Sequence, residues 1–254
     1  MARLPSVFIS HGSPMHALDP GAAGEAWAEL GRRLGKPRAI LIASAHWETN
    51  VPMLTGNPKP ETIHDFSGFP QPLYKLRYPA PGAPDVAQRA QALLKDAAID
   101  GNRGLDHGAW APLLYMYPKA DIPVVQISVQ PAFGPRHHVE VGRSLKKLSE
   151  EGVLIIGSGH MTHNLRDWAR GAGKPEPYAR EFSDWVREKM ENRDLEALAE
   201  YRSLAPHAAR AHPTDEHFLP LFFALGASGD QAKPERIYDG IESGVLAMDS
   251  YVFH

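Results

Sequence analysis

The sequence has 254 residues, of which 43% are hydrophobic and 22% charged, a composition typical of a globular domain with a sizeable core. The formal net charge of −3 gives no support for binding to nucleic acid or to an anionic membrane. Because there are no cysteines, disulfide frameworks, thiolate zinc sites and cysteine nucleophiles are excluded, and any metal must be held by His, Asp or Glu. No segment resembles a signal peptide or reaches membrane-spanning length, so we expect a cytoplasmic enzyme.

The first part of the chain predicts a strand, a helix and two further strands. The apolar run that leads to His46 has no helical spacing and is followed by small residues, which is typical of a strand buried on both faces. Four apolar residues on one face mark the helix, and a glycine marks its end. These elements are predicted at residues 6–11, 21–35, 38–45 and 51–55.

Residues 57–84 differ from the rest of the chain. They contain seven prolines and four aromatic residues and have no helical period. Irregular segments of this length inside a compact domain are usually lids or binding loops. We therefore predict a lid that offers aromatic side chains to a flat substrate, with a proline-stiffened surface loop as the alternative. The candidate lid residues are Phe66, Phe69, Tyr74 and Tyr78.

In the remaining chain, helical and strand patterns continue to alternate without a linker or repeat. Aromatic residues recur at helical spacing in 178–190 and are predicted to belong to the core. The alternation predicts a single α/β domain over residues 1–254, with a mostly parallel central sheet and helices on both faces. The remaining elements are predicted as helices at 84–98, 135–150, 178–190 and 194–201, a polar turn at 104–113, strands at 122–129, 153–160 and 243–253, and a last helix that opens at 215.

Three of the predicted strands lead directly into a histidine. His11, His46 and His160 each follow an apolar run and a serine. Because ligands bind beyond the carboxyl ends of strands in a parallel sheet, we expect the three imidazoles to face one pocket. A lone histidine at a strand end is usually structural, but several buried together favour a metal site. Imidazole binds zinc, copper, nickel and iron, so the type of ligand does not identify the metal.

Other catalytic motifs are missing from the sequence. It has no His-Glu-x-x-His helix, Gly-x-Ser-x-Gly elbow, dinucleotide fingerprint or Walker motif. Ser13 and Ser158 lie near histidines, but no triad order is readable, which argues against a serine hydrolase. The histidines with candidate roles are His11, His46, His107, His160, His163, His212 and His217.

Six motifs, taken in order, resemble the class III extradiol ring-cleavage dioxygenases, and most closely the branch that contains DOPA 4,5-dioxygenases. The resemblance extends from residue 6 to the C-terminal strand and so covers essentially the whole chain. The motifs are Ser10-His-Gly-Ser-Pro14, Ser44-Ala-His-Trp-Glu48, Ile63-His-Asp-Phe-Ser-Gly-Phe-Pro70, Asp106-His-Gly-Ala-Trp110, Gly157-Ser-Gly-His-Met-Thr-His-Asn164 and His212-Pro-Thr-Asp-Glu-His217.

The resemblance implies a metal held by His11 and His46. The third ligand in the wider superfamily is usually a glutamate, which gives a two-His-one-carboxylate site. Here the matching motif offers His217, with Glu216 beside it as the alternative. Fe(II) is expected as the active metal, and Zn(II) as another species that the site could bind.

The resemblance also implies roles in catalysis. His160 matches the acid/base histidine and is expected to approach the metal as an extra ligand when no substrate is bound. His107 is expected to line the pocket as a second group for proton transfer or orientation. Residues predicted to bind the substrate are His64, Phe66 and Phe69.

The implied activity is extradiol cleavage of a catechol, such as a DOPA-like compound, by O2. An imidazole suits the proton transfers of this reaction because its pKa lies near neutrality. Two other classes stay open on the same scaffold: a zinc-dependent hydrolase and a non-catalytic metal-binding protein. The sequence defines neither the catechol nor the oligomeric state.

Overall fold

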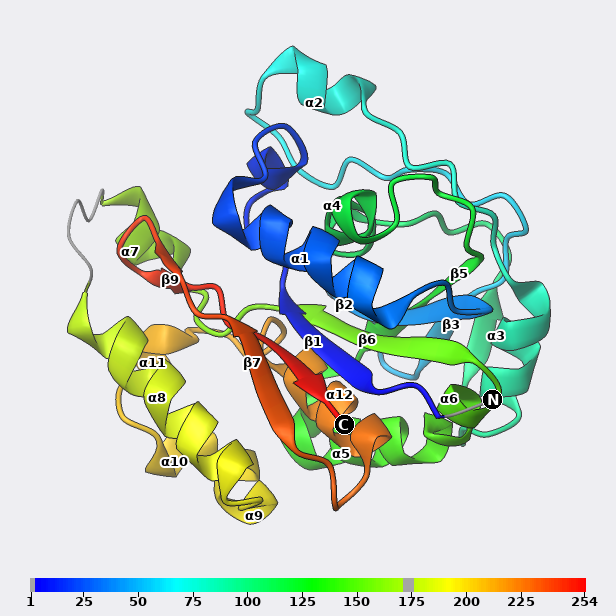
Figure 1. Cartoon of the computed structure of the whole chain (residues 1–254). Helices are drawn as coiled ribbons and strands as arrows, with labels where there is room; N and C mark the ends of the chain where they lie inside the picture. The colour runs from blue at the N-terminus through cyan, green and yellow to red at the C-terminus, as the bar shows by residue number, and fades with distance from the viewer. Residues whose placement is uncertain (1–2, 171–175) are drawn as a thin grey trace.

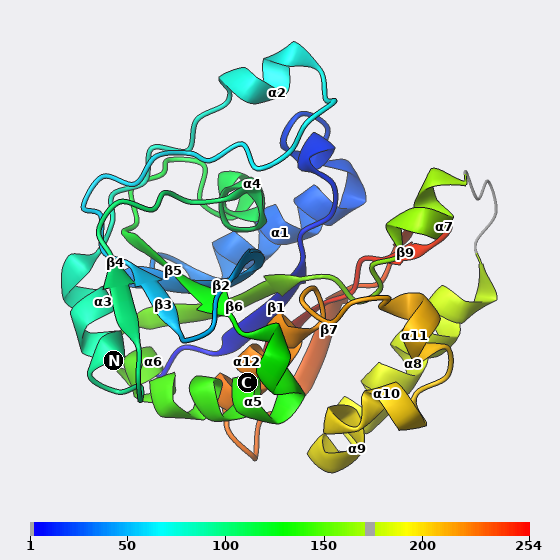
Figure 2. The same ribbon diagram turned by 180° about the vertical axis from the view of Figure 1, so that it is seen from behind.

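One large sheet runs through the protein in the computed structural model, which describes residues 3–170 and 176–254 (Figures 1 and 2). Its strands are β1 (Ser6–Ser10), β2 (Ala39–Glu48), β3 (Met53–Thr55), β4 (Ala98–Asp100), β5 (Val124–Val129), β6 (Val153–Gly159), β7 (Pro234–Tyr238) and β10 (Ser250–Phe253). They lie in the order β4-β3-β5-β2-β6-β1-β10-β7. The central strands β5, β2, β6 and β1 are parallel, and β10 and β7 extend the sheet in antiparallel fashion.

Helices cover both faces of this sheet. Successive residues of β2 point to opposite faces, so Ile40 packs with Trp27 and Trp110, whereas Leu41 packs with Leu145 and Phe223. The first layer is formed by α1 (Gly21–Leu34) and α4 (His107–Met116). The second layer is formed by α3 (Pro84–Gln91), α5 (Gly134–Leu145), α6 (Lys147–Glu150) and α12 (Leu219–Ser228). The predicted α/β class, with a mostly parallel sheet and helices on both faces, is confirmed.

A third group of helices lies at the β7 edge (Figure 1). Tyr178 and Phe182 of α8 are buried in one cluster with Phe218 and Phe222, which confirms their predicted place in the core, whereas Trp185 is only partly buried against this cluster. The remaining elements are α2 (Gln71–Lys75), α7 (Leu165–Ala169), α8 (Pro177–Glu191), α9 (Leu195–Ala199), α10 (Tyr201–Leu204), α11 (Ala208–Ala211), the 3-10 turns η1 (Pro14–Ala17) and η2 (Pro131–Phe133), and the small sheet of β8 (Ile241–Glu242) and β9 (Leu246–Ala247).

Several predicted boundaries are wrong. The helix predicted at 84–98 ends at Gln91; the chain then turns, with Asp96 in a left-handed conformation, and residues 98–100 pair with β3 as β4. The last helix begins at Leu219 and not at 215. The closing strand predicted at 243–253 is divided between β9 and β10, and β7 was not predicted.

The polar turn predicted at 104–113 is a helix for most of its length. This helix, α4, is buried on nearly every side and therefore shows no apolar periodicity. Gly108 allows it to approach β2, since a Cβ atom there would lie 2.4 Å from the Ser44 hydroxyl oxygen. The sequence signal was thus hidden by complete burial.

The segment predicted as a lid supplies both cavity-lining and core residues. Residues 57–84 are irregular apart from the short helix α2, as expected. Tyr78, however, is buried in the core and its hydroxyl donates a hydrogen bond to the carbonyl of Tyr117. The expectation that Tyr78 faces a substrate is therefore wrong.

Helices α5 and α12 cross at a glycine contact that should be sensitive to substitution. A Cβ atom at Gly142 would lie 2.1 Å from the carbonyl oxygen of Phe223, and one at Gly226 would lie 2.0 Å from that of Val139. We expect Gly142→Val to lower the free energy of unfolding by about 2–3 kcal/mol, because backbone must move to admit the side chain. Denaturant unfolding measures this loss. Gly101→Val is the control, since its Cβ would meet no atom within 4 Å, and an equal loss there would contradict the packing argument.

Within the described residues, no helix combines the length and apolar character needed to cross a membrane.

Candidate metal centre

The parallel strands bring three histidines to one end of the sheet, and a fourth joins them from a turn. β1 continues into His11, β2 carries His46 and β6 continues into His160. The strand ends are level, because Ser158 of β6 pairs with both β1 and β2. The fourth histidine, His217, comes from the turn before α12 and accepts a 2.7 Å hydrogen bond from the backbone N–H of His160 through its carbonyl.

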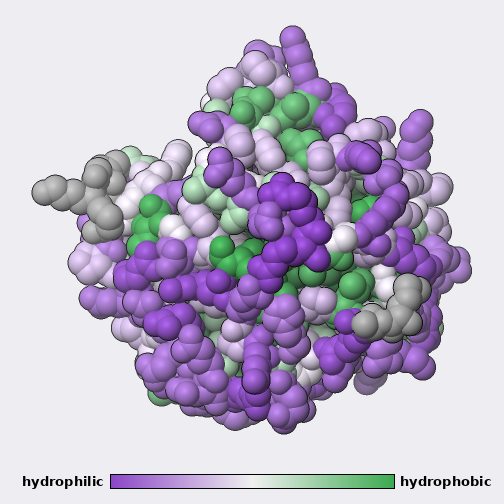
Figure 3. Space-filling view, viewed as in Figure 1, coloured by the Kyte–Doolittle hydropathy of each residue, from purple (hydrophilic) through white to green (hydrophobic). Residues whose placement is uncertain are grey.

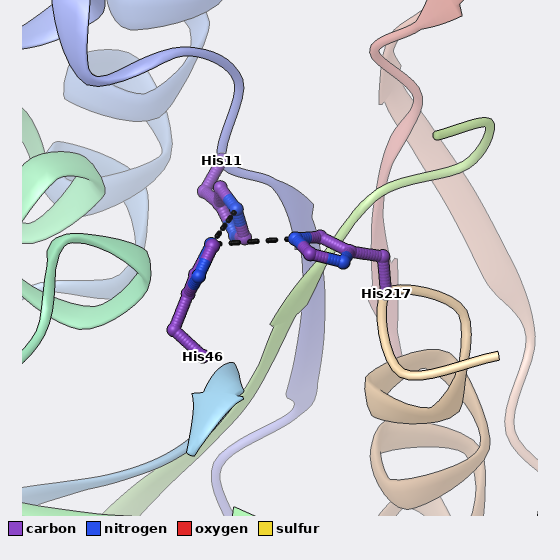
Figure 4. A group of neighbouring side chains, drawn as sticks. All are labelled: His11, His46 and His217. Carbon is purple, nitrogen blue, oxygen red and sulfur yellow. Dashed lines mark hydrogen bonds between the residues drawn. The ribbon is translucent and has the colours of Figure 1, made fainter. Parts of the chain in front are cut away.

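Three of these imidazoles point their Nε2 atoms at one another (Figure 4). The Nε2 atom of His46 lies 3.1 Å from that of His11 and 3.3 Å from that of His217. Nitrogen ligands about 2.0–2.1 Å from a tetrahedral metal ion are separated by about 3.3–3.4 Å, so the spacing suits a shared cation. The group fits a metal ion held on three imidazoles.

The opposite nitrogen, Nδ1, is hydrogen-bonded in His11 and His217 and faces a carboxylate in His46. Nδ1 of His11 donates to the Ser158 hydroxyl at 3.0 Å, and that hydroxyl donates onward to the carbonyl of Gly108. Nδ1 of His217 donates to the Glu216 carboxylate at 2.8 Å. Nδ1 of His46 lies 3.4 Å from the Asp65 carboxylate. These partners keep the proton on Nδ1 and leave the Nε2 lone pairs free for a metal.

Burial favours the neutral form of the three rings. It lowers the pKa of His46 to about 3 and holds the pKa values of His11 and His217 well below the ordinary histidine value. Repulsion from neighbouring imidazoles lowers them further. Neutral imidazole is the form that ligates metals, so the site is ready to bind one at neutral pH.

His160 and His107 lie beside this group in different settings. Among the described residues, no close group of candidate ligand atoms includes His160, whose Nδ1 is buried without a hydrogen-bond partner. Its expected role as an extra ligand stays a prediction. Asp65 holds His107 at two points, accepting from its Nδ1 at 2.9 Å and from its backbone N–H at 2.9 Å. The His107 ring centre lies 4.0 Å from that of His46.

A cavity of about 330 Å3 opens above the histidines. Its size is typical of a site for a small molecule. Phe66 and Phe69 line it, whereas His64 lies behind Phe66 and its Nε2 faces the carbonyl of Leu76 at 3.1 Å. Tyr74 packs against Phe66 and does not line the cavity. The lining residues are His11, Gly12, Ser13, Pro14, His46, Asp65, Phe66, Phe69, His107, His160, His163, Leu165, Trp168, His217 and Leu246.

Comparison with known proteins decides the family. Residues 5–254 match the family described as the catalytic LigB subunit of aromatic ring-opening dioxygenase. The chain belongs to this family of ring-opening dioxygenases. It is therefore an enzyme that acts on an aromatic substrate with O2.

Individual relatives of this dioxygenase agree with the family. It is 43% identical to a 4,5-DOPA dioxygenase extradiol from Beta vulgaris over 97% of this chain and 95% of the relative. It is 40% identical to a protein of the same name from Escherichia coli K12, over 97% and 93% of the two chains. A crystal structure of an uncharacterized E. coli K12 protein superposes with a TM-score of 0.85 at 35% identity and covers 99% of this chain and 100% of the other.

Sequence reasoning named His163 as a candidate without giving it a role, and it missed Asp65 of the dioxygenase site. The ring of His163 stacks on that of His217, with centres 3.5 Å apart and planes 14° apart, and lines the cavity. Asp65 contacts both His46 and His107. Both residues belong to the motifs quoted above, but their partners are distant in sequence. His212, also a candidate, is buried against Phe218 with its Nε2 on the carbonyl of Met161, which is a core position.

Proposed function

We propose that this dioxygenase cleaves a catechol beside its two hydroxyls, with Fe(II) held by His11, His46 and His217. The observation that carries the proposal is the position of the Nε2 atom of His46, 3.1 Å from that of His11 and 3.3 Å from that of His217. In each ring an oxygen atom faces Nδ1 on the other side. The neutral three-imidazole set with room for further ligands suits non-haem iron. Bound Fe(II) supplies the chemistry that allows O2 to react with the ring.

We propose that His160 and His107 transfer protons or accept hydrogen bonds from the substrate. His160 is fully buried, and burial with repulsion from His163 lowers its pKa well below the ordinary value, so it is neutral before substrate binds. A neutral imidazole can accept a hydroxyl proton from the catechol and return it as the ring rearranges. The bond from Nδ1 of His107 to Asp65 leaves Nε2 of His107 free to accept a hydrogen bond from the substrate.

The aromatic walls position the ring. Phe66 and Phe69 contact one another with ring centres 5.3 Å apart and lie on the side of the cavity formed by the lid segment. Flat apolar side chains of this kind bury an aromatic substrate and keep water from the reacting ring. The relatives named as DOPA dioxygenases support a catechol as the substrate class.

Oxygen-electrode traces with a panel of catechols, run alongside elemental analysis, test this proposal. Protein loaded with Fe(II) should consume one O2 for each catechol and form a yellow ring-opened product. Hydrolysis without oxygen uptake would instead support the zinc hydrolase. Stoichiometric metal without turnover of any catechol would support a non-catalytic metal-binding protein.

A Glu216→Gln variant separates the two candidates for the third ligand. We propose that Glu216 acts through His217, because its Oε1 accepts from Nδ1 and the Nε2 atom of His217 faces the other rings. The variant should then bind Fe(II) about 10–100-fold more weakly, as is typical when an outer partner of a ligand is lost. Chelator competition measures the affinity. The matched control is Glu181→Gln, which alters a similar bond to His207 on the surface. Complete loss of metal in Glu216→Gln would make the carboxylate itself the ligand.

A further inference from the structure

Two large apolar side chains are exposed at the mouth of the cavity. Leu165 is 53% exposed and Trp168 is 46% exposed, and both line the cavity above the histidines. They stand three residues apart on α7, a spacing that places them on the same side of a helix. Figure 3 shows hydrophobic surface in the region of α7 and β9 and again near α2, within a face that is mostly polar. An exposed apolar patch at a cavity mouth is typical of a binding surface.

The short helix that carries them is firmly anchored. The side chain of Asn164 caps its N-terminus by accepting from the backbone N–H groups of Arg166 and Asp167. Asp167 is itself buried and accepts from Nε of Arg210 at 2.8 Å. These bonds direct the polar side of α7 into the protein. Leu165 and Trp168 are therefore held toward the cavity before any ligand arrives.

The other side of the mouth is also apolar. Phe66 and Phe69 belong to the lid segment, and Leu246 and Pro14 also line the cavity. Asp65 also lines the cavity, and both of its carboxylate oxygens accept hydrogen bonds from His107. A charged group placed between these walls would lose hydration without gaining a partner from them. An alkyl or aryl group placed there would instead be transferred from water into contact with apolar side chains, which is favourable.

We infer that Leu165 and Trp168 form a subsite for an apolar substituent of the catechol, so that alkyl- or aryl-substituted catechols are preferred to catechols with a charged amino-acid side chain. This inference rests on the proposed catechol cleavage. In the bound state the ring lies over the histidines and its substituent extends outward between α7 and the lid segment. Burial of one methylene adds roughly three- to four-fold to kcat/KM.

The test compares kcat/KM for catechol, 4-butylcatechol and DOPA in the Fe(II)-loaded protein. We expect 4-butylcatechol to exceed catechol by at least about 10-fold and to exceed DOPA as well. Trp168→Ala should lower the ratio of 4-butylcatechol to catechol by about 10-fold, and Trp168→Phe should restore most of it. Using a ratio cancels any general loss of activity. Leu204→Ala is the control, because Leu204 is 56% exposed and does not line the cavity.

Three other outcomes would overturn the subsite, and one of them would also overturn the proposed function. Preference for DOPA, or an unchanged ratio in Trp168→Ala, would overturn the subsite and leave catechol cleavage standing. If no catechol is cleaved, the proposed function fails and the subsite fails with it. A change in sedimentation of Trp168→Ala with an unchanged ratio would show that Trp168 contacts another protein chain, which also overturns the subsite.

Discussion

A His46→Ala protein is expected to bind no metal after reconstitution with Fe(II). His46 is the ring whose Nε2 lies within 3.1 and 3.3 Å of both other candidate ligands, so its removal leaves two imidazoles that no longer enclose a cation. The loss of affinity should exceed the roughly 10–100-fold effect of losing an outer partner. Elemental analysis after gel filtration, together with chelator competition, measures the result.

His254→Ala provides a matched control for this experiment. His254 is an exposed histidine that also pairs with a carboxylate, Glu235, but it lies at the C-terminus and outside the cavity. It should retain full metal content. If His46→Ala retains full metal content too, His46 is not a ligand, and the three-imidazole centre proposed here is wrong. Circular dichroism of both variants checks that each is folded.

The central sheet could be predicted because its strands are buried on both faces. A short apolar run such as that of β2, without helical spacing and followed by small residues, favours a strand buried on both faces. α4 and β7 were missed for opposite reasons. α4 is buried on nearly every side and has no polar face, whereas every residue of β7 is only partly buried and the strand lies at the sheet edge. The apolar residues therefore show no helical periodicity in α4 and only a weak alternation in β7.

Some residues of the site could be predicted from local sequence patterns and others could not. His11, His46 and His160 were found from the sequence because each lies at or just after the carboxyl end of a parallel strand, and these ends meet at one side of the sheet. His217 follows a turn and was one of several candidate histidines, so only the resemblance to a family gave it the role of third ligand. Asp65 comes from the irregular lid segment, and its contact with His107 joins residues 42 positions apart. No local pattern encodes such a pair.

A His160→Gln protein is expected to keep most of its metal and to lose turnover by about 10²–10⁴-fold. Glutamine preserves the approximate size of the side chain and its ability to form hydrogen bonds, but it cannot take up a proton at neutral pH. His160 stands outside the group formed by His11, His46 and His217, so metal content should not depend on it. Single-turnover rates of oxygen uptake, measured at matched Fe(II) content, test this.

The contrast between the two variants assigns separate roles to two histidines that end neighbouring parallel strands. Loss of metal in His46→Ala with retention in His160→Gln would mean that the sheet supplies a ligand from one strand and a proton-transfer group from the next. Loss of metal in both variants would mean that His160 is a metal ligand and not mainly a proton-transfer group. Because the backbone N–H of His160 also bonds to the carbonyl of His217, the glutamine variant leaves that link intact, and a loss of metal there would report the imidazole itself.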